Sequence, residues 1–314
     1  MTVWEVPEPL AVDEVRLDEE TVTTIRRHGR PDAPLRLVLS HGNGLAIDAY
    51  YPFWSLLADE FDLIVYDVRN HGWNAVGEQT NHNIPTMIHD HDVLAGAIAE
   101  RYGDKPTVGV FHSLTTIVAI LSFSDPYSAL VLFDPPFCKP AASEAEFDDA
   151  ADRATALTRR RASYFRSEEE FSDLLRYSPV YARVLPGVRE LVASTTLRRA
   201  ADAADGEGRE LRCPREFEAQ VSEYVRICPA AGSEPAFLPD EGDRRRPDPA
   251  VCVPAELRPE EHPERGLRLH RGLKPLPATG ETGGMRRHAP GFSASDGFAG
   301  RVHPVTPAFE GIAG

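Results

Sequence analysis

Four short, almost entirely apolar segments recur along the first half of the chain, and each runs directly into a polar turn. They are residues 35–40, 63–67, 107–111 and 129–133. Continuous apolar runs of this length are typical of strands that are covered on both faces, as in a parallel sheet. Residues 22–28 form one more β-rich run. Segments with a helical pattern lie between the strands, at residues 48–59, 85–102 and 114–123. This alternation predicts an α/β fold with a mostly parallel, doubly wound sheet and helices on both faces.

Ser113 stands where an apolar strand segment meets an apolar helix that begins at Leu114. A tight turn from a strand into a helix projects a serine hydroxyl, and the start of the helix offers free backbone amides. Acyl transfer to a serine needs amides of this kind for the oxyanion, from the next residue and from a loop after an earlier strand. We therefore predict an oxyanion hole made by the backbone amides of Leu114 and Asn43.

Three motifs, in this order and spacing, resemble those of the α/β-hydrolase family, and the resemblance covers about residues 15–225. Ser-His-Gly-Asn-Gly at residues 40–44 is similar to the oxyanion-loop motif of that family. Asp-Val-Arg-Asn-His-Gly at residues 67–72 is similar to its turn after the next strand. Phe-His-Ser-Leu-Thr at residues 111–115 stands where the Gly-x-Ser-x-Gly nucleophile elbow belongs. The resemblance implies the family's fold, with Ser113 as the nucleophile.

The same resemblance marks a set of residues that support the site. They are His41, Gly42 and Gly44 in the oxyanion loop, Asp67, Arg69 and His71 in the next turn, and His112 beside the nucleophile. We expect His71 to tie down its own turn and His112 to be packed or hydrogen-bonded away from the pocket. The elbow departs from the family pattern because Phe111 and Thr115 replace both glycines, which normally let strand and helix approach closely. If the elbow does not form, Ser113 is an ordinary turn serine.

The catalytic acid and histidine are harder to assign. The family order is nucleophile, acid, then histidine, with the last two on loops after late strands, and nothing beyond residue 225 resembles a strand. Asp134 ends the strand after the nucleophile's, a position from which some family members supply the acid. It is the fallback acid, and otherwise a turn residue before two prolines. No histidine is identified as the base.

The sequence predicts neither a metal nor a cofactor. His89 and His91 alternate with Asp90 and Asp92, but neighbours at i and i+2 on a helix face apart. We expect this segment to be a solvated helix face. No Gly-x-Gly-x-x-Gly motif follows the first strand, which argues against an NAD-binding domain.

The chain divides into three parts. Residues 1–140 carry the predicted α/β-hydrolase core, and residues 141–227 form a charged, helical segment where many family members insert a cap. Ser-Glu-Glu-Glu at residues 167–170 is a capping box, which predicts that a helix begins there. Pro186 is placed to start another helix. Residues 228–314 hold 13 of the 27 prolines and 12 of the 23 glycines, with one isoleucine and no tyrosine or tryptophan. That composition cannot build a core, and it predicts an irregular or disordered tail.

An out-of-frame origin would explain this tail. If each codon is read from its second base, residues 242–249 permit Val-Ile-Gly-Ala-Asp-Pro-Thr-Leu, a strand that leads into a loop aspartate. Residues 270–285 permit Ile-Glu-Gly-Ser-Asn-His-Phe-Leu-Gln-Leu-Glu-Lys-Pro-Glu-Glu-Cys, which resembles the family's histidine loop and the helix after it. We therefore predict a frameshift between about residues 227 and 236. The missing last strands would expose an edge of the sheet and lower solubility.

These features predict a serine hydrolase that cleaves an ester or related acyl bond of a small molecule through a Ser113 acyl-enzyme. Without the acid and histidine loops its activity would be impaired or lost, and the alternative is a non-catalytic relic or small-molecule-binding protein.

The net charge of −15 argues against nucleic acid or a membrane as a partner. Four cysteines without a Cys-x-x-Cys pair and the lack of a signal-like start favour the cytoplasm. The oligomeric state is left open.

Overall fold

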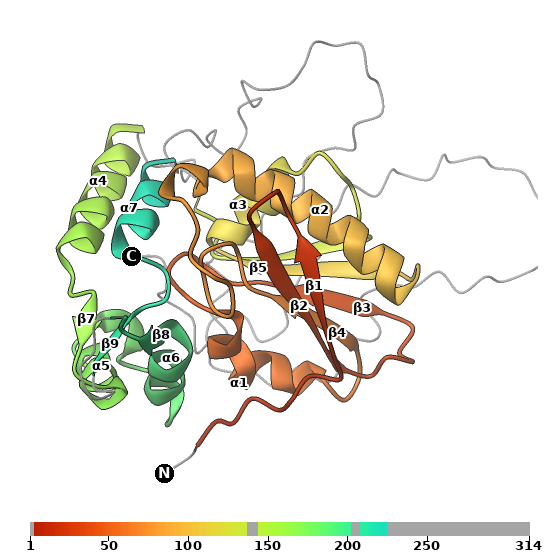
Figure 1. The fold of residues 1–314 in the computed structure, drawn as a ribbon, viewed down its shortest axis with the longest axis horizontal. Helices are drawn as coiled ribbons and strands as arrows, with labels where there is room; N and C mark the ends of the chain where they lie inside the picture. Colours follow the sequence, from red (N-terminus) through yellow and green to blue (C-terminus); the bar gives the residue numbers. More distant parts are fainter. Residues whose placement is uncertain (1–2, 137–143, 202–207, 225–314) are drawn as a thin grey trace, which may run out of the picture.

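A computed structural model describes residues 3–136, 144–201 and 208–224 (Figure 1). The predicted core and most of the predicted cap lie within these ranges. The predicted tail of residues 228–314, together with its proposed frameshift, lies outside the described residues.

A six-stranded sheet forms the centre of the core, in the order β1-β2-β4-β3-β5-β6. The strands are β1 (Ala11–Arg16), β2 (Val22–Gly29), β3 (Arg36–Leu39), β4 (Asp62–Tyr66), β5 (Thr107–His112) and β6 (Ala129–Phe133). Strands β3 to β6 are parallel, whereas β1 and β2 pair antiparallel at one edge. All five predicted strand segments are strands, and the mostly parallel sheet is confirmed. Strand β1 was not predicted, because one of its faces is largely solvated and it has no continuous apolar run.

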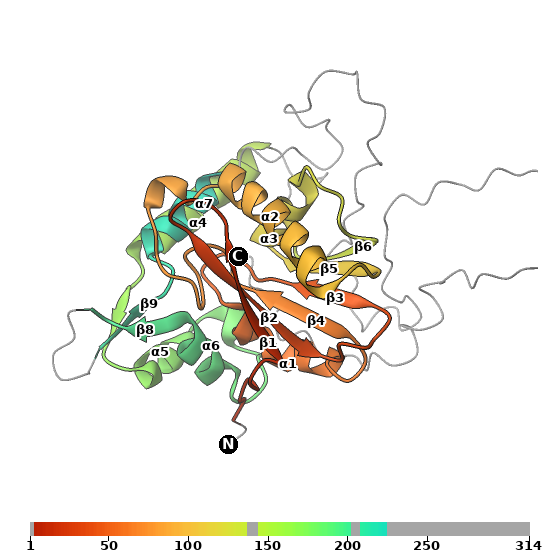
Figure 2. The ribbon, with the colours of Figure 1, turned by 45° about the vertical axis from the view of Figure 1, so that its right-hand side comes forward.

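Helices cover both faces of this sheet (Figures 1 and 2). Helices α2 (Ile84–Tyr102) and α3 (Leu114–Leu121) pack on one face. The opposite face carries the one-turn elements η1 (Ile47–Tyr50), α1 (Tyr51–Trp54) and η2 (Ser55–Leu57). A further short turn, η3 (Gln79–Asn81), precedes α2, which begins after Asn83, whose side chain accepts a hydrogen bond from the Thr86 amide. This is the usual capping of a helix N-terminus.

The core has two layers, one on each face of the sheet, because successive side chains of a strand point to opposite faces. Leu37 and Leu39 of β3 pack with Trp54 below the sheet, whereas Val38 packs with Phe111 under α2 and α3. Because side chains alternate between faces of a strand, one run of apolar residues fills both layers. The carboxyl ends of β3, β4, β5 and β6 are thereby held at one common edge.

Residues 144–201 and 208–224, which make up most of the predicted cap, lie beside that edge (Figure 1). Their helices are α4 (Glu144–Arg160), α5 (Glu168–Leu175), α6 (Val188–Thr196) and α7 (Arg215–Tyr224), with the short η4 (Pro179–Tyr181). The predicted helix start at Ser167 is present, since its side chain accepts a hydrogen bond from the Glu170 amide. The segment is not wholly helical. It also holds an antiparallel sheet of β7 (Tyr164–Phe165), β9 (Arg209–Leu211) and β8 (Leu197–Arg199), whose strands are too short to show a period in the sequence.

The prediction of a solvated helix face at residues 89–92 is wrong for two of the four residues. Asp90 and His91 are buried in α2, with 4% and 2% of their surfaces exposed. Arg69 forms a bidentate ion pair with Asp90, at 2.5 and 2.6 Å, and Tyr66 shares a hydrogen bond of 3.0 Å with His91. The tertiary partners of these polar residues come from β4 and the turn after it, so the helix sequence did not reveal them.

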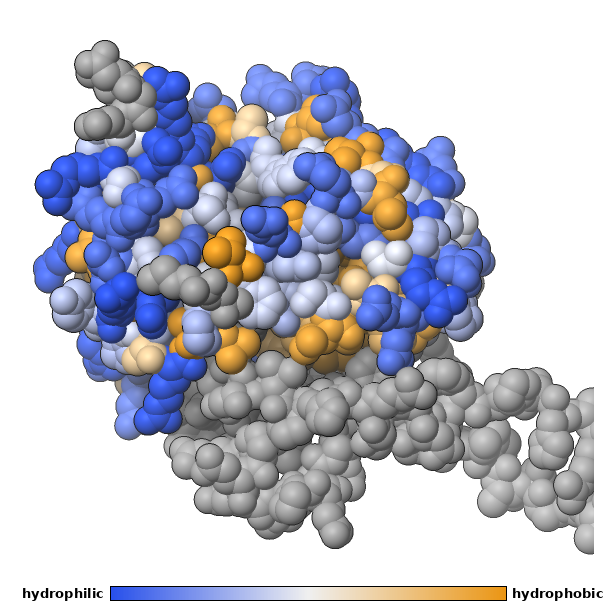
Figure 3. Space-filling view, turned by 90° about the horizontal axis from the view of Figure 1, so that it is seen from below, coloured by the Kyte–Doolittle hydropathy of each residue, from blue (hydrophilic) through white to orange (hydrophobic). Residues whose placement is uncertain are grey.

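Exposed apolar side chains are spread over the surface. Figure 3 shows separate apolar patches among hydrophilic residues on one face. Scattered exposure of this kind is normal for folded proteins. Within the described ranges, no helix combines the length and the apolar composition that a membrane span requires.

Candidate active site

Ser113 occupies a strained turn between β5 and α3. Its backbone has φ 48° and ψ −113°, in the positive-φ region that residues with a side chain rarely adopt. The Ser113 amide donates to the carbonyl oxygen of Phe133 on β6, at 2.9 Å, which anchors the turn to the neighbouring strand. The other positive-φ residues that are not glycine in the described chain are Asn70 and Asp134. They follow β4 and β6, so all three lie at the carboxyl edge, and such strain clusters at functional sites.

The elbow forms without its two glycines because other residues compensate. The hydroxyl of Thr115 accepts a hydrogen bond from the His112 amide, at 3.2 Å, and donates one to the His112 carbonyl, at 3.1 Å. The ring of Phe111 is turned away from the elbow and packs over Gly109 in the layer under α2. Close approach to the elbow instead depends on Gly42, where an added Cβ would lie 2.6 Å from His112 Nδ1 and 3.3 Å from Ser113 Cβ.

The two predicted oxyanion donors are both available. The amide of Gly42 donates to the Tyr50 hydroxyl, at 3.1 Å, and the amide of Gly44 donates to His71 Nε2, at 3.0 Å. Between them, the Asn43 amide has no acceptor among the described residues, and neither has the Leu114 amide at the start of α3. Among the described residues, the flanking amides are thus held in hydrogen bonds, whereas the amides of Asn43 and Leu114 have no acceptor, as the predicted oxyanion hole requires.

The turn after β4 supports the oxyanion loop from below. His41 Nε2 accepts from the Val68 amide, at 3.1 Å, and His41 Nδ1 donates to the Gly42 carbonyl, at 2.7 Å. Asp67 is fully buried, and its Oδ1 accepts from the Ile47 amide, at 2.8 Å. Burial lowers the pKa of His41, so the ring is neutral and can accept the Val68 proton. Two of the predicted supporting residues thus act through backbone contacts.

His71 and Arg69 have different surroundings in that turn. His71 Nδ1 donates to the Arg69 carbonyl, at 2.9 Å, while its Nε2 receives the Gly44 amide proton, so it ties its own turn to the oxyanion loop. Burial holds the pKa of His71 well below its ordinary value. The guanidinium of Arg69 points away to Asp90 and Asp18, and it anchors α2 and the β1–β2 turn rather than the pocket.

His112 faces away from the side chain of Ser113. Its Nδ1 lies 2.8 Å from the Tyr50 hydroxyl, which also receives the Gly42 amide proton. Burial lowers the pKa of His112 to about 4, which keeps the ring neutral. No motif in the sequence indicated Tyr50.

The cap reaches the oxyanion loop through α7. Asn43 Nδ2 donates to the main-chain carbonyl of Glu218, at 2.8 Å. The Glu218 carboxylate forms an ion pair with Arg161 and packs directly against Gly44, where it fills the place that a Cβ would take. Burial raises the pKa of Glu218. The contacts of Glu218 with Asn43 and Gly44 join residues more than 170 positions apart, and the sequence alone did not suggest them.

A general base for Ser113 is not found in the described part of the chain. No described residue hydrogen-bonds to the Ser113 hydroxyl, and the ring nitrogens of His41 and His71 are fully engaged. Four further histidines lie outside the described residues, at His262, His270, His288 and His303. Asp134 stands after β6 with φ 46°, at the same edge as Ser113. Its place is compatible with the fallback acid, but the histidine that it would serve is not present among these residues.

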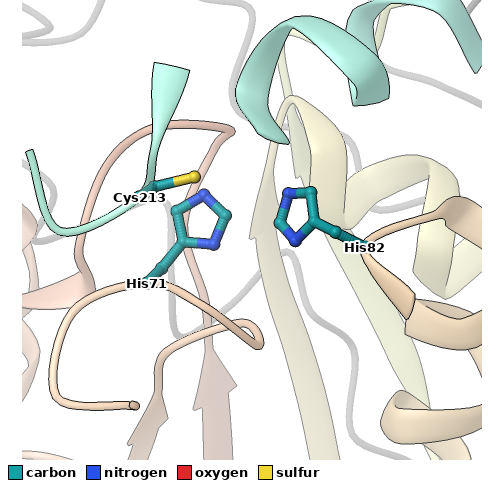
Figure 4. A group of neighbouring side chains, drawn as sticks. All are labelled: His71, His82 and Cys213. Atoms are coloured by element: carbon teal, nitrogen blue, oxygen red, sulfur yellow. The ribbon is translucent and has the colours of Figure 1, made fainter. Parts of the chain in front are cut away.

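One buried group has the composition of a metal site (Figure 4). His71, His82 and Cys213 are buried, and their possible ligand atoms lie within 4.8 Å of one another. Asn70 Oδ1 accepts from the Gly77 amide, at 2.7 Å, so its Nδ2 donates to His82 Nδ1, at 2.9 Å, and the His82 proton is on Nε2. A metal ligand must present a free lone pair, and both nitrogens of His71 are also engaged. The group therefore does not fit a metal in this hydrogen-bonded arrangement.

Comparisons with known proteins bear on the fold of this chain. A crystal structure of E-2-(acetamidomethylene)succinate hydrolase is similar with a TM-score of 0.54 and 20% identity, over 69% of this chain and 73% of that one. An α/β hydrolase from Novosphingobium aromaticivorans is similar with a TM-score of 0.52 and 14% identity, over 67% and 71%. At these identities the likeness shows the fold. No curated protein gives a significant match.

A family model, described as the alpha/beta hydrolase family, matches residues 37–301. The match covers most of the chain and continues past residue 228, so the out-of-frame origin of the tail stays a prediction for the gene sequence to test. Together with the sheet order, the family match shows that the chain belongs to the alpha/beta hydrolase family.

Proposed function

We propose that this protein is a serine hydrolase that acts on an ester or related acyl bond of a small molecule, with Ser113 as the nucleophile. The observation that carries the proposal is the pair of unpaired amides, Asn43 and Leu114, on either side of a strained Ser113. An oxyanion hole stabilises the transition state most when its donors are fixed before the reaction. The loop after β3 holds the Asn43 amide, and the start of α3 holds the Leu114 amide.

In the proposed reaction, Ser113 Oγ attacks the acyl carbon and the oxyanion forms between the two amides. The bond to the leaving group then breaks, which leaves the acyl group on Ser113, and the Ser113 proton passes through water to the departing alcohol or phenol. Water hydrolyses the acyl-enzyme in a second step. A serine in the nucleophile position does not favour epoxide or haloalkane hydrolysis, which the family performs with an aspartate there.

The proposal includes impaired activity in this chain. The described residues supply a nucleophile and an oxyanion hole but no base, and loss of the base from a serine triad costs about a million-fold in turnover. Both acylation and deacylation need proton transfer, so an acyl group that reaches Ser113 should be released slowly. A cytoplasmic location stays a prediction from the cysteine pattern.

Acylation of the full chain by p-nitrophenyl acetate tests this function. With this ester, the Ser113 proton passes to the buffer, p-nitrophenolate leaves, and one acetyl group is added to the protein. Intact mass spectrometry should show a single acetyl adduct, peptide mapping should place it on Ser113, and the Ser113→Ala variant should lack it. An adduct of equal size in Ser113→Ala, or no adduct in either protein, would refute the catalytic proposal.

The absence of a base among the described residues favours one second function, a non-catalytic relic that binds small molecules. In that case the pocket would retain ligands without chemistry. Slow hydrolysis at equal rates in the original protein and Ser113→Ala would favour this alternative.

A further inference from the structure

The oxyanion loop is joined to the nucleophile elbow by a chain of hydrogen bonds that runs through two buried side chains. The Gly42 amide donates to Tyr50 Oη, at 3.1 Å, and Tyr50 Oη lies 2.8 Å from His112 Nδ1. Tyr50 follows the loop within η1, and His112 directly precedes Ser113. Both side chains are buried, with 5% and 3% of their surfaces exposed.

One direction in this chain is determined by its donor. A backbone amide can only donate, so Tyr50 Oη accepts from Gly42, and it shares a second hydrogen bond with His112 Nδ1. The arrangement requires a neutral His112 and a neutral Tyr50. Burial produces both conditions, because it lowers the pKa of His112 and raises that of Tyr50.

The position of the chain gives it a consequence for catalysis. Gly42 carries the amide that is held by Tyr50, and the next amide in the loop is that of Asn43, the proposed oxyanion donor. An added Cβ on Gly42 would lie 3.3 Å from Ser113 Cβ, so the loop and the elbow are in close contact at this residue. A shift of the Gly42 peptide would turn the Asn43 amide away from the acyl oxygen.

We infer that Tyr50 and His112 are positioning residues, which hold the Asn43 amide at the distance from Ser113 that oxyanion binding requires. The inference rests on the proposed function, and it assigns neither residue a contact with substrate. If Tyr50 loses its hydroxyl, the Gly42 amide and His112 Nδ1 are both left buried without a partner, and the loop can relax away from the elbow.

A second buried pair provides a matched control. Tyr66 Oη lies 3.0 Å from His91 Nδ1, and both side chains are buried, but no backbone amide of the oxyanion loop donates to Tyr66. Tyr50→Phe and Tyr66→Phe therefore each remove one hydroxyl and one contact with a buried imidazole. Only the first should disturb the oxyanion loop.

The test measures acylation of Ser113 by p-nitrophenyl acetate over a range of ester concentrations. Removal of an oxyanion donor lowers turnover by about 100- to 1000-fold, so its displacement in Tyr50→Phe should lower the maximal acylation rate by about 10- to 100-fold. The half-saturating ester concentration should stay the same, because the oxyanion exists only in the transition state. Tyr66→Phe should acylate at the original rate. His112→Asn, which keeps a hydrogen-bonding amide group near the Nδ1 position, should retain more activity than His112→Leu.

Hydrogen exchange supplies a readout that does not depend on the chemistry. Amides of the segment 41–46 should exchange faster in Tyr50→Phe than in the original protein, and Tyr66→Phe should leave them unchanged. If Ser113 is acylated and Tyr50→Phe acylates at the original rate, the positioning role is refuted while the proposed function stands. If no Ser113 adduct forms at all, the proposed function fails, and equal exchange in the two tyrosine variants would then overturn the positioning role as well.

Discussion

The ring of Phe111 lies over Gly109, two residues earlier on the same face of β5. A Cβ on residue 109 would collide with the edge of that ring and would come within 2.8 Å of Leu130 Cδ2. The glycine missing from the elbow at position 111 is thus matched by a glycine at 109 that makes room for the ring. Close packing leaves little freedom for either side chain to move, since Phe111 is fully buried.

Gly109→Ala should therefore destabilise the protein. Overpacking of a filled core costs about 1–3 kcal/mol in the free energy of unfolding. Gly96→Ala is the matched control, because Gly96 lies within α2 with no atom within 4 Å of an added Cβ. That change should stabilise the helix by about 0.5–1 kcal/mol. Urea unfolding measures both, and an equal response of the two variants would contradict the packing argument.

Thr115→Val should loosen the elbow. The change keeps the shape of the side chain but leaves the His112 amide without its acceptor, which costs about 1–3 kcal/mol in a buried site. We expect a lower midpoint of urea unfolding and slower acylation of Ser113. Thr196→Val in α6 also removes a buried hydroxyl, which donates to the Val192 carbonyl at 2.6 Å. It should affect stability without slowing acylation, and slower acylation in both variants would argue against a local effect at the elbow.

Acidification should destabilise the fold through its buried histidines. Burial lowers the pKa of His91 to about 4, whereas an unfolded histidine has a pKa near ~6.5. As the pH falls below that value, the unfolded chain takes up a proton that the folded protein does not, so stability is lost on the way from pH ~6.5 to ~4. The free energy of unfolding of His91→Gln should fall less steeply between pH ~6 and ~5, by about 1 kcal/mol per pH unit. Identical slopes for this variant and the original protein would show that His91 is not buried as a neutral ring.

Correction of the reading frame near codons 227–236 should raise turnover of an acyl substrate, by up to about a million-fold if a complete triad is restored. Replacement of His262, His270, His288 and His303 in the present chain should leave its rate unchanged. Sequencing of the gene around codons 225–245 decides whether such a correction is possible. A frame whose codons forbid the shifted aspartate and histidine motifs would exclude a frameshift, and loss of activity on replacing one of the four histidines would identify an in-frame base.

The existence of strands β3 to β6 and the place of Ser113 after β5 followed from local patterns. Each of β3 to β6 is a short apolar run that ends in a polar turn, and such a run can be recognised without its neighbours because both of its faces are buried. The elbow at Ser113 and the loop at residues 40–44 were found in the same way, because their chemistry depends on residues adjacent in the chain.

Contacts between distant segments were decided by the tertiary structure alone. Tyr50, Glu218 and Asp90 carry no local signal, since their partners lie 21 to 175 residues away or belong to the backbone of another loop. A buried polar group needs a partner, but the sequence does not say where that partner is. The sequence by itself determined an alpha/beta sheet with a serine at its carboxyl edge. Only the folded chain decided which amides around that serine are held in hydrogen bonds and which two have no acceptor among the described residues.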